Sequence, residues 1–486
     1  MLPRLRDEPA KLAADMPDGQ LSYGELDAQS AHLAASLPAG PLALWATPSL
    51  ATIVGLVAAL RAGVPLIPIS PKAGELELAH VLADAAPRAV LSGPAVELPG
   101  ALAGLTRIDV APEPRASGHA RDGSAEELPA LTPAGDEPAE ELPALIMYTS
   151  GTTGSPKGVV QSRRSLIANL DALTEIWGLT RADVVVHSLP LFHVHGLVLG
   201  TIGPLRLGGC VRHLGRFEVE STARAMADGA SVLFGVPTMY HRLAAAAEHE
   251  PRIAEALRRP RLLASGSAAL GVEVHRSIER LTGRTVVERY GMTETLIISS
   301  TRPGEPGRPG WVGTPLPGVS VRVRDERGAD VPRDGQTMGG VWVRGPSVFA
   351  RYANRGQSPA GSFEGEWFDT GDLAVLAADG ALRLVGRSST DLIKSGGYRM
   401  AAGEIESALL RHPAVSEAAV RGLPDVELGE RVVAWTVLAD RPPVTDRQLI
   451  EHVAQQLTPH KRPREIRRVA SLPRNELGKV RKQLLE

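Results

Sequence analysis

Short apolar runs that alternate with amphipathic segments occupy the chain from about residue 24 to about residue 290. The clearest runs are LALWA (42–46), VPLIPI (64–69), DVVVHSL (183–189), SVLFG (231–235) and TVVERY (285–290). Apolar runs of strand length, separated by segments with helical spacing, are typical of parallel sheets whose faces are covered by helices. The sequence therefore predicts the α/β fold class, with stacked, helix-covered sheets.

The pattern changes after Gly318. The segments VSVRVRDERG, GGVWVRG and GALRLVGR alternate apolar and polar residues between tight glycine turns, which predicts a small antiparallel β subdomain. Beyond Arg387 an α/β pattern resumes, with AGEIESALLRH and RQLIEHVAQQL helical and VSEAAVRG and RVVAWTVL strand-like. We therefore predict a large N-terminal domain over residues 1–387 and a small α+β C-terminal domain over residues 388–486. A stretch from Pro94 to Leu142, rich in Pro, Ala, Gly and acids, predicts a long surface connection.

Bulk composition excludes several classes of protein. The chain has 486 residues, a net charge of -2 and one cysteine, Cys210. These numbers favour more than one domain, give no support for a nucleic-acid partner and exclude an internal disulfide framework. The N-terminus lacks an apolar signal core, and the most apolar stretch, Leu50 to Leu60, is too short to span a bilayer. We therefore expect a soluble, cytoplasmic protein without a membrane or nucleic-acid partner, acting as a monomer.

The segment YTSGTTGSPKG, Tyr148 to Gly158, follows an apolar run and carries most of the chemistry. Its glycines allow backbone N–H groups to turn inward as an anion nest, with hydroxyl donors around them and Lys157 as a counter-charge. It is not a Walker A loop, because Gly-Lys-Ser/Thr is absent at the required spacing. A flexible linker is the alternative, but linkers seldom follow a buried strand directly, so we predict phosphate binding.

This segment resembles the phosphate loop of the adenylate-forming superfamily, which includes acyl-CoA synthetases, adenylation domains and luciferases. Further segments of that superfamily follow in order: SGSAAL (265–270), YGMTET (290–295), FDTGD (368–372), GRSSTDLIKSGGYRM (386–400) and PRNELGKV (473–480). The resemblance covers nearly the whole chain. It implies that a carboxylate attacks the α-phosphorus of ATP, giving an acyl-adenylate and pyrophosphate, and that the acyl group then passes to coenzyme A.

The resemblance also implies roles for individual residues around ATP and Mg²⁺. Glu294 is the expected Mg²⁺ ligand, since magnesium combines one or two carboxylates with phosphate oxygens and waters, and Thr293 is expected near the α-phosphate. The remaining expected contacts are Thr149, Ser150, Thr152, Thr153 and Lys157 for the phosphates, Gly266, Ser267, Ala268, Glu288 and Tyr290 for the adenine side, and Asp372 and Arg387 for the ribose. Taken alone, Asp372 could merely stabilise a turn and Arg387 could be a surface charge; their order and spacing favour the functional interpretation.

By the same resemblance, Lys479 is the lysine that bridges the substrate carboxylate and the phosphate during adenylation. A lysine so near the C-terminus implies a mobile C-terminal domain, which then rotates to admit the thiol arm of coenzyme A. The expected coenzyme A contacts are Lys394, Ser395, Gly396 and Gly397. Ser389 occupies the hinge position, where Asp or Lys is more common.

Arg289 directly precedes YGMTET, so its side chain can reach the acyl pocket. An unpaired guanidinium would harm a fatty-acid or aryl-acid pocket, whereas a second substrate carboxylate would give it a bidentate partner. Pairing with Glu288 is the alternative, although adjacent strand residues point to opposite faces. His193 and His195, in PLFHVHG, are both candidates for a further contact, and Ser265 and Met292 complete the expected acyl site.

The combination of PLFHVHG, SGSAAL and ERYGMTET resembles the malonyl-CoA synthetase family. That resemblance implies an ATP-dependent acid–thiol ligase that converts malonate, and also methylmalonate, to the CoA thioester with release of AMP and pyrophosphate. The alternatives are a short- or medium-chain monocarboxylate acyl-CoA synthetase, a stand-alone adenylation enzyme that loads a carrier protein, and a catalytically silent binding protein.

Overall fold

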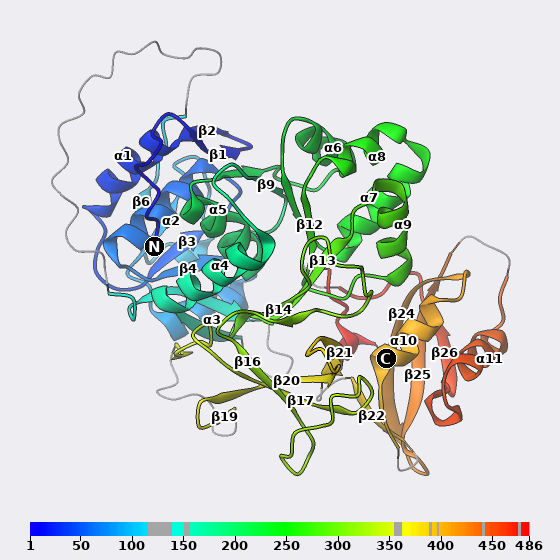
Figure 1. Ribbon diagram of the computed structural model, residues 1–486. Coiled ribbons are helices and arrows are strands. Elements are labelled where there is room, and N and C mark those ends of the chain that lie inside the picture. The colour runs from blue at the N-terminus through cyan, green and yellow to red at the C-terminus, as the bar shows by residue number, and fades with distance from the viewer. Residues whose placement is uncertain are drawn as a thin grey trace. The chain divides into compact units, whose positions relative to one another are not determined.

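The computed structural model describes residues 1–114, 139–149, 156–353, 362–387, 391–395, 398–439, 443–474 and 478–485, and the chain forms two compact units (Figure 1). Unit 1 comprises Met1–Pro309, Leu316–Val319 and Gly345–Ala360, and unit 2 comprises Gly310–Pro315, Ser320–Arg344 and Gly361–Glu486. The domain boundary expected after residue 387 falls inside unit 2, and that division of the chain stays a prediction.

The first sheet of unit 1 is largely parallel. Its strands that belong to unit 1 follow the order β14 (Leu296–Ser300), β13 (Val286–Met292), β12 (Leu262–Ser265), β11 (Val232–Gly235), β9 (Val184–His187), β10 (Cys210–His213), β1 (Leu12–Met16) and β2 (Gly19–Ser22). The pairs from β13 through to β1 are parallel, and the β13–β14 and β1–β2 pairs are antiparallel. The predicted strands around residues 184, 232, 262 and 286 are confirmed.

The second sheet of unit 1 mixes parallel and antiparallel pairs. Its order is β18 (Arg351–Tyr352), β8 (Lys157–Ser162), β7 (Pro143–Thr149), β4 (Leu66–Ile69), β3 (Leu42–Trp45), β5 (Ala89–Ser92) and β6 (Thr106–Asp109). Strands β7 and β8 form an antiparallel hairpin, and β18 pairs with β8. The expectation of one long connection from Pro94 to Leu142 is wrong in part, because β6 lies within it and adds an edge strand to this sheet; residues 115–138 lie outside the described residues.

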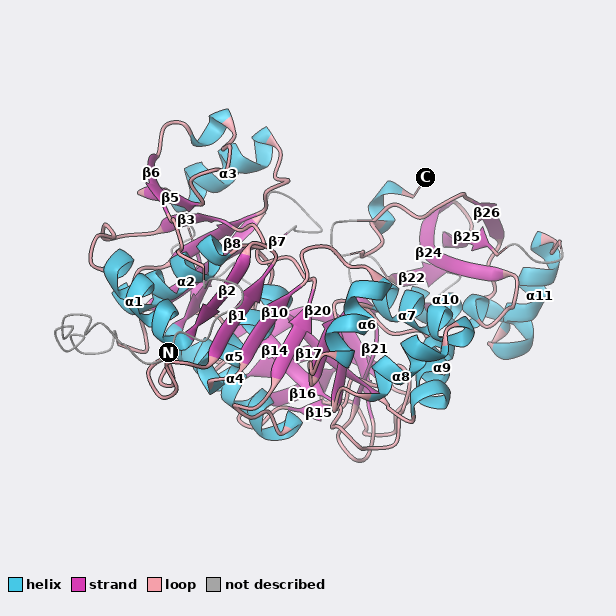
Figure 2. Cartoon of the chain, turned by 90° about the horizontal axis from the view of Figure 1, so that it is seen from above, coloured by secondary structure: helices cyan, strands magenta, loops and turns pink. Residues whose placement is uncertain are grey.

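Helices cover the sheets, as the apolar periodicity predicts (Figure 2). Unit 1 contains α1 (Tyr23–Ala34), α2 (Leu50–Ala62), α3 (Glu75–Ala85), the short 3₁₀ helix η1 (Gly100–Leu102), α4 (Arg163–Trp177), the π-helix η2 (Val194–Ile202), α5 (Gly203–Leu207), α6 (Val219–Ala227), α7 (Pro237–His249), α8 (Pro251–Arg258) and α9 (Val272–Thr282). None of the helices among the described residues is long and apolar enough to cross a membrane.

Neighbouring side chains along a strand point to opposite faces of the sheet, and their contacts show how the helices and sheets of unit 1 are layered. In β11, Val232 and Phe234 pack in the core that contains α1, α2 and α4, whereas Leu233 packs against α6 to α9. In β3, Leu42 enters that same central core while Trp45 packs under α3. Helices α1, α2 and α4 therefore lie between the two sheets, with α6 to α9 on one outer face and α3 on the other. The burial of nearly every residue of α2 explains why Leu50–Leu60 is so apolar.

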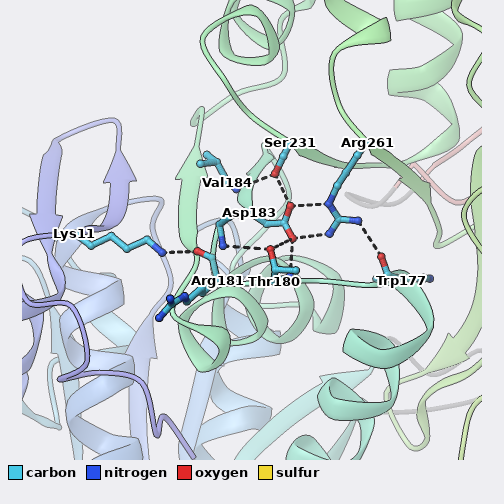
Figure 3. Close-up of polar contacts among 9 residues, drawn as sticks. Lys11, Trp177, Thr180, Arg181, Asp183, Val184, Ser231 and Arg261 are labelled. Atoms are coloured by element: carbon cyan, nitrogen blue, oxygen red, sulfur yellow. Dashed lines mark hydrogen bonds and ion pairs between the residues drawn. The ribbon is translucent and has the colours of Figure 1, made fainter.

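A half-buried ion pair connects the amino-terminal ends of β9, β11 and β12 (Figure 3). The Arg261 Nε and Nη2 atoms donate to the two carboxylate oxygens of Asp183 at 2.8 and 2.5 Å, and Ser231 Oγ donates to the same carboxylate at 2.7 Å. Burial alone would raise the pKa of Asp183, but these donors and the backbone N–H of Thr180 hold it below its usual value. The carboxylate therefore stays charged inside the fold.

Unit 2 contains one antiparallel sheet and one mixed sheet. The first holds β16 (Ser320–Arg324), β17 (Met338–Arg344), β20 (Trp367–Leu376) and β19 (Phe363–Glu364), with β21 (Leu382–Arg387) paired to β20. The second holds β23 (Tyr398–Ala401), β22 (Leu392–Ser395), β25 (Gly429–Leu438) and β24 (Val415–Asp425), with β26 (Glu465–Arg468) parallel to β25. The remaining elements of unit 2 are β15 (Thr314–Pro315), α10 (Ala402–Leu410), α11 (Asp446–Gln456), η3 (Pro459–Lys461) and η4 (Lys482–Leu484).

The C-terminal segment is held on unit 2 by its own apolar contacts. Leu472 and Leu485 pack with Val433 and Trp435 on one face of the second sheet, and α10 and α11 cover the other face. The predicted antiparallel β subdomain, both C-terminal helices and both C-terminal strands are confirmed. The docked C-terminal segment fixes where Lys479 lies within unit 2.

Candidate active site

The two ends of the phosphate-loop segment are anchored by α3. Strand β7 ends at Thr149 opposite Lys157, the first residue of β8. Tyr148 donates its hydroxyl to Asp84 at 2.7 Å, and a ring nitrogen of His80 lies 2.7 Å from the carbonyl oxygen of Pro156. The predicted phosphate contacts Ser150, Thr152 and Thr153 lie outside the described residues, whereas Tyr148 and Pro156 on either side of them both contact α3.

Thr293 and Glu294 lie in the tight turn between β13 and β14. Gln161 of β8 donates to the carbonyl oxygen of Thr293 at 2.7 Å, so the turn is joined to the strand that begins with Lys157. The Glu294 side chain is buried and accepts a hydrogen bond from the Tyr352 hydroxyl at 3.1 Å. The predicted magnesium carboxylate and phosphate lysine therefore lie in one region of unit 1.

The donor set fits Mg²⁺ bound together with a nucleotide. Among the described residues no group of three or more His, Cys, Asp or Glu side chains could hold a metal ion. Magnesium bound to a nucleotide needs only one or two protein carboxylates, since phosphate oxygens and waters supply its other ligands. Glu294 alone satisfies that requirement.

The expected adenine side is built where β12 and β13 end. Ser265 pairs with Glu288 across the two strands, and the Glu288 carboxylate accepts from the backbone N–H of Leu270 at 3.2 Å, which closes the turn between them. Ser267, within this turn, has a φ of 73°. A left-handed backbone at a residue other than glycine is uncommon and tends to occur at functional sites. Tyr290 is buried beside this turn on β13.

Arg289 is buried, and none of the described acidic residues pairs with it. Its side chain is 9% exposed, and its Nε and Nη2 atoms have no hydrogen-bond partner within the described part of the chain. A Cβ atom placed on Gly266 would lie 2.6 Å from the Arg289 Cζ atom, so the guanidinium rests directly on the Gly266 backbone. Burial lowers the pKa of Arg289 to about 9, which leaves the group charged at neutral pH.

The alternative pairing of Arg289 with Glu288 is therefore not observed. The two side chains leave β13 in different directions, as expected of neighbouring strand residues, and the Glu288 carboxylate serves the Leu270 turn instead.

His195 lies close enough to Arg289 for the positive charge of Arg289 to lower the pKa of the imidazole. The imidazole is 5% exposed, and neither ring nitrogen has a hydrogen-bond partner within the described residues. Burial, followed by repulsion from Arg289, holds the pKa of His195 well below its usual value, so the ring is neutral and keeps one donor and one acceptor. His193 is only half-buried and packs on Phe192, which favours His195 as the substrate contact.

The π-helix η2 explains how His195 is held in place. A Cβ atom on Gly196 would lie 2.3 Å from the carbonyl oxygen of Pro190, and one on Gly200 would lie 2.7 Å from the Nε2 atom of His187. Only glycine allows these approaches. Isolated π-helical turns are frequent at functional sites, and this one was not predicted, since its sequence looks like an ordinary apolar segment. Ser265, whose buried hydroxyl also has no partner within the described residues, and the half-buried Met292 are the other expected acyl contacts.

Unit 2 brings together the expected ribose residues and Lys479. Asp372 on β20 faces Arg387 on β21, and the Arg387 Nε atom lies 3.0 Å from an Asp372 carboxylate oxygen. Desolvation lowers the pKa of Lys479, repulsion from Arg387 lowers it further, and Asp372 opposes both effects. Residues separated by about a hundred positions in sequence thus share one electrostatic environment.

The expected coenzyme A contacts are only partly described. The backbone N–H of Lys394 donates to Glu430 at 2.6 Å, and Ser395 is buried at the end of β22. Gly396, Gly397 and the expected hinge residue Ser389 lie outside the described residues.

The fold and these groupings define an adenylate-forming enzyme, and comparison with known proteins agrees. Residues 4–353 match the AMP-binding enzyme family, and residues 404–479 match the C-terminal domain of AMP-binding enzymes. The chain belongs to the AMP-binding enzyme family.

Particular relatives can be named. The chain is 34% identical over 463 residues to the mitochondrial malonate–CoA ligase of Bos taurus, covering 89% of this chain and 78% of the relative. A solved malonyl-CoA ligase, a ternary product complex with methylmalonyl-CoA and AMP bound, is 49% identical, with a TM-score of 0.73 and coverage of 98% of this chain and 100% of the other. ATP-bound MatB from Rhodopseudomonas palustris is 34% identical, with a TM-score of 0.88 and coverage of 99% and 97%.

Proposed function

We propose that this protein is an ATP-dependent, AMP-forming CoA ligase that converts malonate, and also methylmalonate, to the CoA thioester. Membership of the AMP-binding enzyme family supports the use of ATP, Mg²⁺ and coenzyme A. The guanidinium of Arg289 lies near the neutral His195 and has no acidic partner among the described residues, which supports a substrate with a second carboxylate. One carboxylate reacts while the other is held.

In the adenylation step the chain must bring two anions together. Lys157 and the hydroxyls of the 149–153 segment would hold the departing phosphates, and Glu294 would hold Mg²⁺. Bound magnesium would neutralise phosphate charge. Lys479 would place its ammonium between the reacting carboxylate and the α-phosphate, where a fixed charge lowers the repulsion between the reactants. Asp372 and Arg387 would hold the ribose.

In the second step the thiol of coenzyme A attacks the acyl-adenylate and AMP leaves. We propose that residues 388–486 form a mobile domain that turns about Ser389 between the steps, with Lys394, Ser395, Gly396 and Gly397 shaping the thiol channel. We also propose a cytoplasmic location and a monomeric state. The single cysteine, Cys210, is buried and free, which suits a reducing compartment.

The observation that carries the diacid proposal is Arg289, because a buried guanidinium without an acidic partner is costly unless a ligand completes the pair. In a bidentate pair the guanidinium and the carboxylate would each satisfy the other.

The test measures AMP and CoA-thioester formation with malonate, methylmalonate, succinate, acetate and butyrate. For Arg289→Met we expect kcat/KM for malonate to fall by about 10²–10⁴-fold, which corresponds to breaking a buried charge pair, with acetate activity kept or raised. Arg276→Met, on the exposed face of α9, is the matched control and leaves the profile unchanged. Faster turnover of acetate or butyrate than malonate by the wild type would identify a monocarboxylate enzyme instead.

A further inference from the structure

Tyr352 contacts both charged groups of the expected phosphate and metal site. It lies on β18, a two-residue strand paired with β8, so that Tyr352 is opposite Val159 and close to Lys157. The backbone N–H of Ala353 donates to the carbonyl oxygen of Gly158 at 2.7 Å, and that of Ala350 donates to Val160 at 3.2 Å. The strand therefore runs directly beside the C-terminal flank of the phosphate-loop segment.

The two contacts use different parts of the Tyr352 side chain. Its hydroxyl donates to the Glu294 carboxylate at 3.1 Å, and the Lys157 Nζ atom lies 5.3 Å from the centre of its ring. That distance is within the range of a cation–π interaction. The side chain is 5% exposed, and Phe349, 4.8 Å away between ring centres, packs edge-on against it. The Tyr352 side chain thus contacts a cation through its ring and an anion through its hydroxyl.

The ammonium of Lys157 and the carboxylate of Glu294 carry opposite charges and attract each other. A direct ion pair would satisfy both groups and compete with the phosphate that the lysine should bind and the metal that the carboxylate should bind. Among the described residues, no ion pair joins Lys157 to Glu294. The π face of Tyr352 stabilises the lysine without neutralising it, and the hydroxyl fixes the carboxylate orientation with one hydrogen bond.

We propose that Tyr352 is a positioning residue that keeps Lys157 and Glu294 apart and orients each of them separately for the phosphates and for Mg²⁺. The proposal rests on the proposed function, which assigns those roles to Lys157 and Glu294. A purely structural role for Tyr352 would make the ring important for packing and leave the hydroxyl without effect on metal binding.

The decisive variant is Tyr352→Phe, which keeps the ring and its packing but removes the hydrogen bond to Glu294. ATP binding is measured by calorimetry across a series of Mg²⁺ concentrations, and Mn²⁺ binding in the presence of ATP is followed by electron paramagnetic resonance. Because a hydrogen bond to a charged group contributes appreciably, we expect the metal concentration for half-saturation to rise about tenfold. Tyr352→Leu should weaken ATP binding a further two- to fivefold, about the loss of one cation–π contact.

Two controls separate the possible causes. Tyr23→Phe removes another buried tyrosine hydroxyl, which donates to the carbonyl oxygen of Gly209 at 2.7 Å on a different part of unit 1, and should leave metal binding unchanged. In a Glu294→Gln background, Tyr352→Phe should have no further effect on metal binding, because the hydroxyl acts through that carboxylate.

Wild-type metal affinity in Tyr352→Phe, or an equal loss in the Glu294→Gln background, would overturn the positioning role. Failure of the wild type to bind ATP at any Mg²⁺ concentration would instead reject the proposed function, and with it the roles on which this inference rests.

Discussion

Asp372 and Arg387 face each other across β20 and β21, with 3.0 Å between the Arg387 Nε atom and a carboxylate oxygen of Asp372. The strand register places the pair, and the Asp372 side chain is largely buried. Lys479 lies within their electrostatic reach. The ion pair with Arg387 therefore holds the Asp372 carboxylate near Lys479, a residue close to the C-terminus.

The first prediction concerns this carboxylate. Asp372→Asn keeps the size of the side chain but replaces a charged acceptor by a neutral amide. If Asp372 binds the ribose hydroxyls, the KM for ATP should rise about 10–100-fold, the range for losing hydrogen bonds to a charged group. The measurement is ATP-dependent pyrophosphate exchange with malonate. Asp330→Asn, an exposed acid on the same unit, should leave that KM unchanged; an unchanged KM in Asp372→Asn would remove Asp372 from the nucleotide site.

The second prediction compares two arginines of unit 1. Arg289 is buried and has no acidic partner in the part of the chain that the structure describes, whereas Arg261 is paired with the buried Asp183. Replacing Arg289 by Met should raise the free energy of unfolding of the free protein by about 1–3 kcal/mol, the usual cost of leaving buried donors unsatisfied. Replacing Arg261 by Met should lower it by about 3 kcal/mol, since Asp183 loses its counter-charge.

Chemical denaturation of both variants, with and without malonate, tests this comparison. Malonate should stabilise the wild type and Arg261→Met but not Arg289→Met, because only a protein that binds the ligand gains stability from it. If both arginine variants are destabilised to the same extent, Arg289 has a structural partner and the substrate clamp is wrong.

The sequence predicts the parts of this fold that depend on local pattern. Apolar runs identified β9, β11, β12 and β13, and the strand alternation of Glu288 and Arg289 indicated that the two side chains point apart. The order of the layers, with α2 buried between two sheets, could not be predicted. An apolar helix sequence shows that the helix will be buried but does not specify which elements will pack against it. The edge strand β6 was missed because its exposed, polar residues resemble a loop.

The candidate site also combines residues that the sequence could indicate with a residue that it could not. Motif order selected Glu294, Asp372 and Lys479 as candidates, because each belongs to a segment with its own signature; their roles stay predictions. Tyr352 has no signature of this kind. It is 58 residues from Glu294, and two tertiary contacts bring them together: the pairing of β18 with β8, and the hydrogen bond from the Phe349 N–H to the Glu294 carbonyl oxygen at 2.7 Å. Contacts that depend on tertiary strand pairing lie beyond single-sequence reasoning.

The third prediction follows from the lowered pKa of Lys479. A lysine with a lowered pKa loses its proton at a lower pH than an ordinary lysine, so a step that needs the ammonium should decline as the pH rises through that lowered value. The adenylation rate, followed by malonate-dependent pyrophosphate exchange, should therefore have an alkaline limb below the ordinary lysine pKa of about 10.4. Lys479→Arg should be slower but should keep its charge, which moves this limb to higher pH.

The control for this profile is the second half-reaction, in which preformed malonyl-adenylate reacts with coenzyme A. That step does not need the Lys479 ammonium in the proposed mechanism, so its pH profile should not change in Lys479→Arg. An alkaline limb that is identical in the wild type and Lys479→Arg would assign the titration to another group.

The fourth prediction concerns Lys482, which anchors the segment that carries Lys479. Its Nζ atom lies 2.5 Å from an Asp391 oxygen and 2.6 Å from a Glu406 oxygen, and all three side chains are largely buried. Asp391 also accepts from the backbone N–H of Arg387 at 2.9 Å. Lys482 therefore links the C-terminal segment to Asp391, which directly precedes β22, and to α10. Lys482→Met should lower the free energy of unfolding by about 3 kcal/mol near neutral pH, since two carboxylates lose their shared cation.

The pH dependence of that loss gives the sharper test. Burial raises the pKa of Glu406, while Lys482 opposes the increase. Removing Lys482 should raise this pKa further, so the folded variant binds a proton that the unfolded chain does not, and its stability falls as the pH rises through the shifted value. The deficit relative to the wild type should therefore shrink in acid and grow towards neutral pH. Lys482→Met combined with Glu406→Gln should remove much of this slope, whereas a deficit that is the same at every pH would mean that Lys482 acts only through packing.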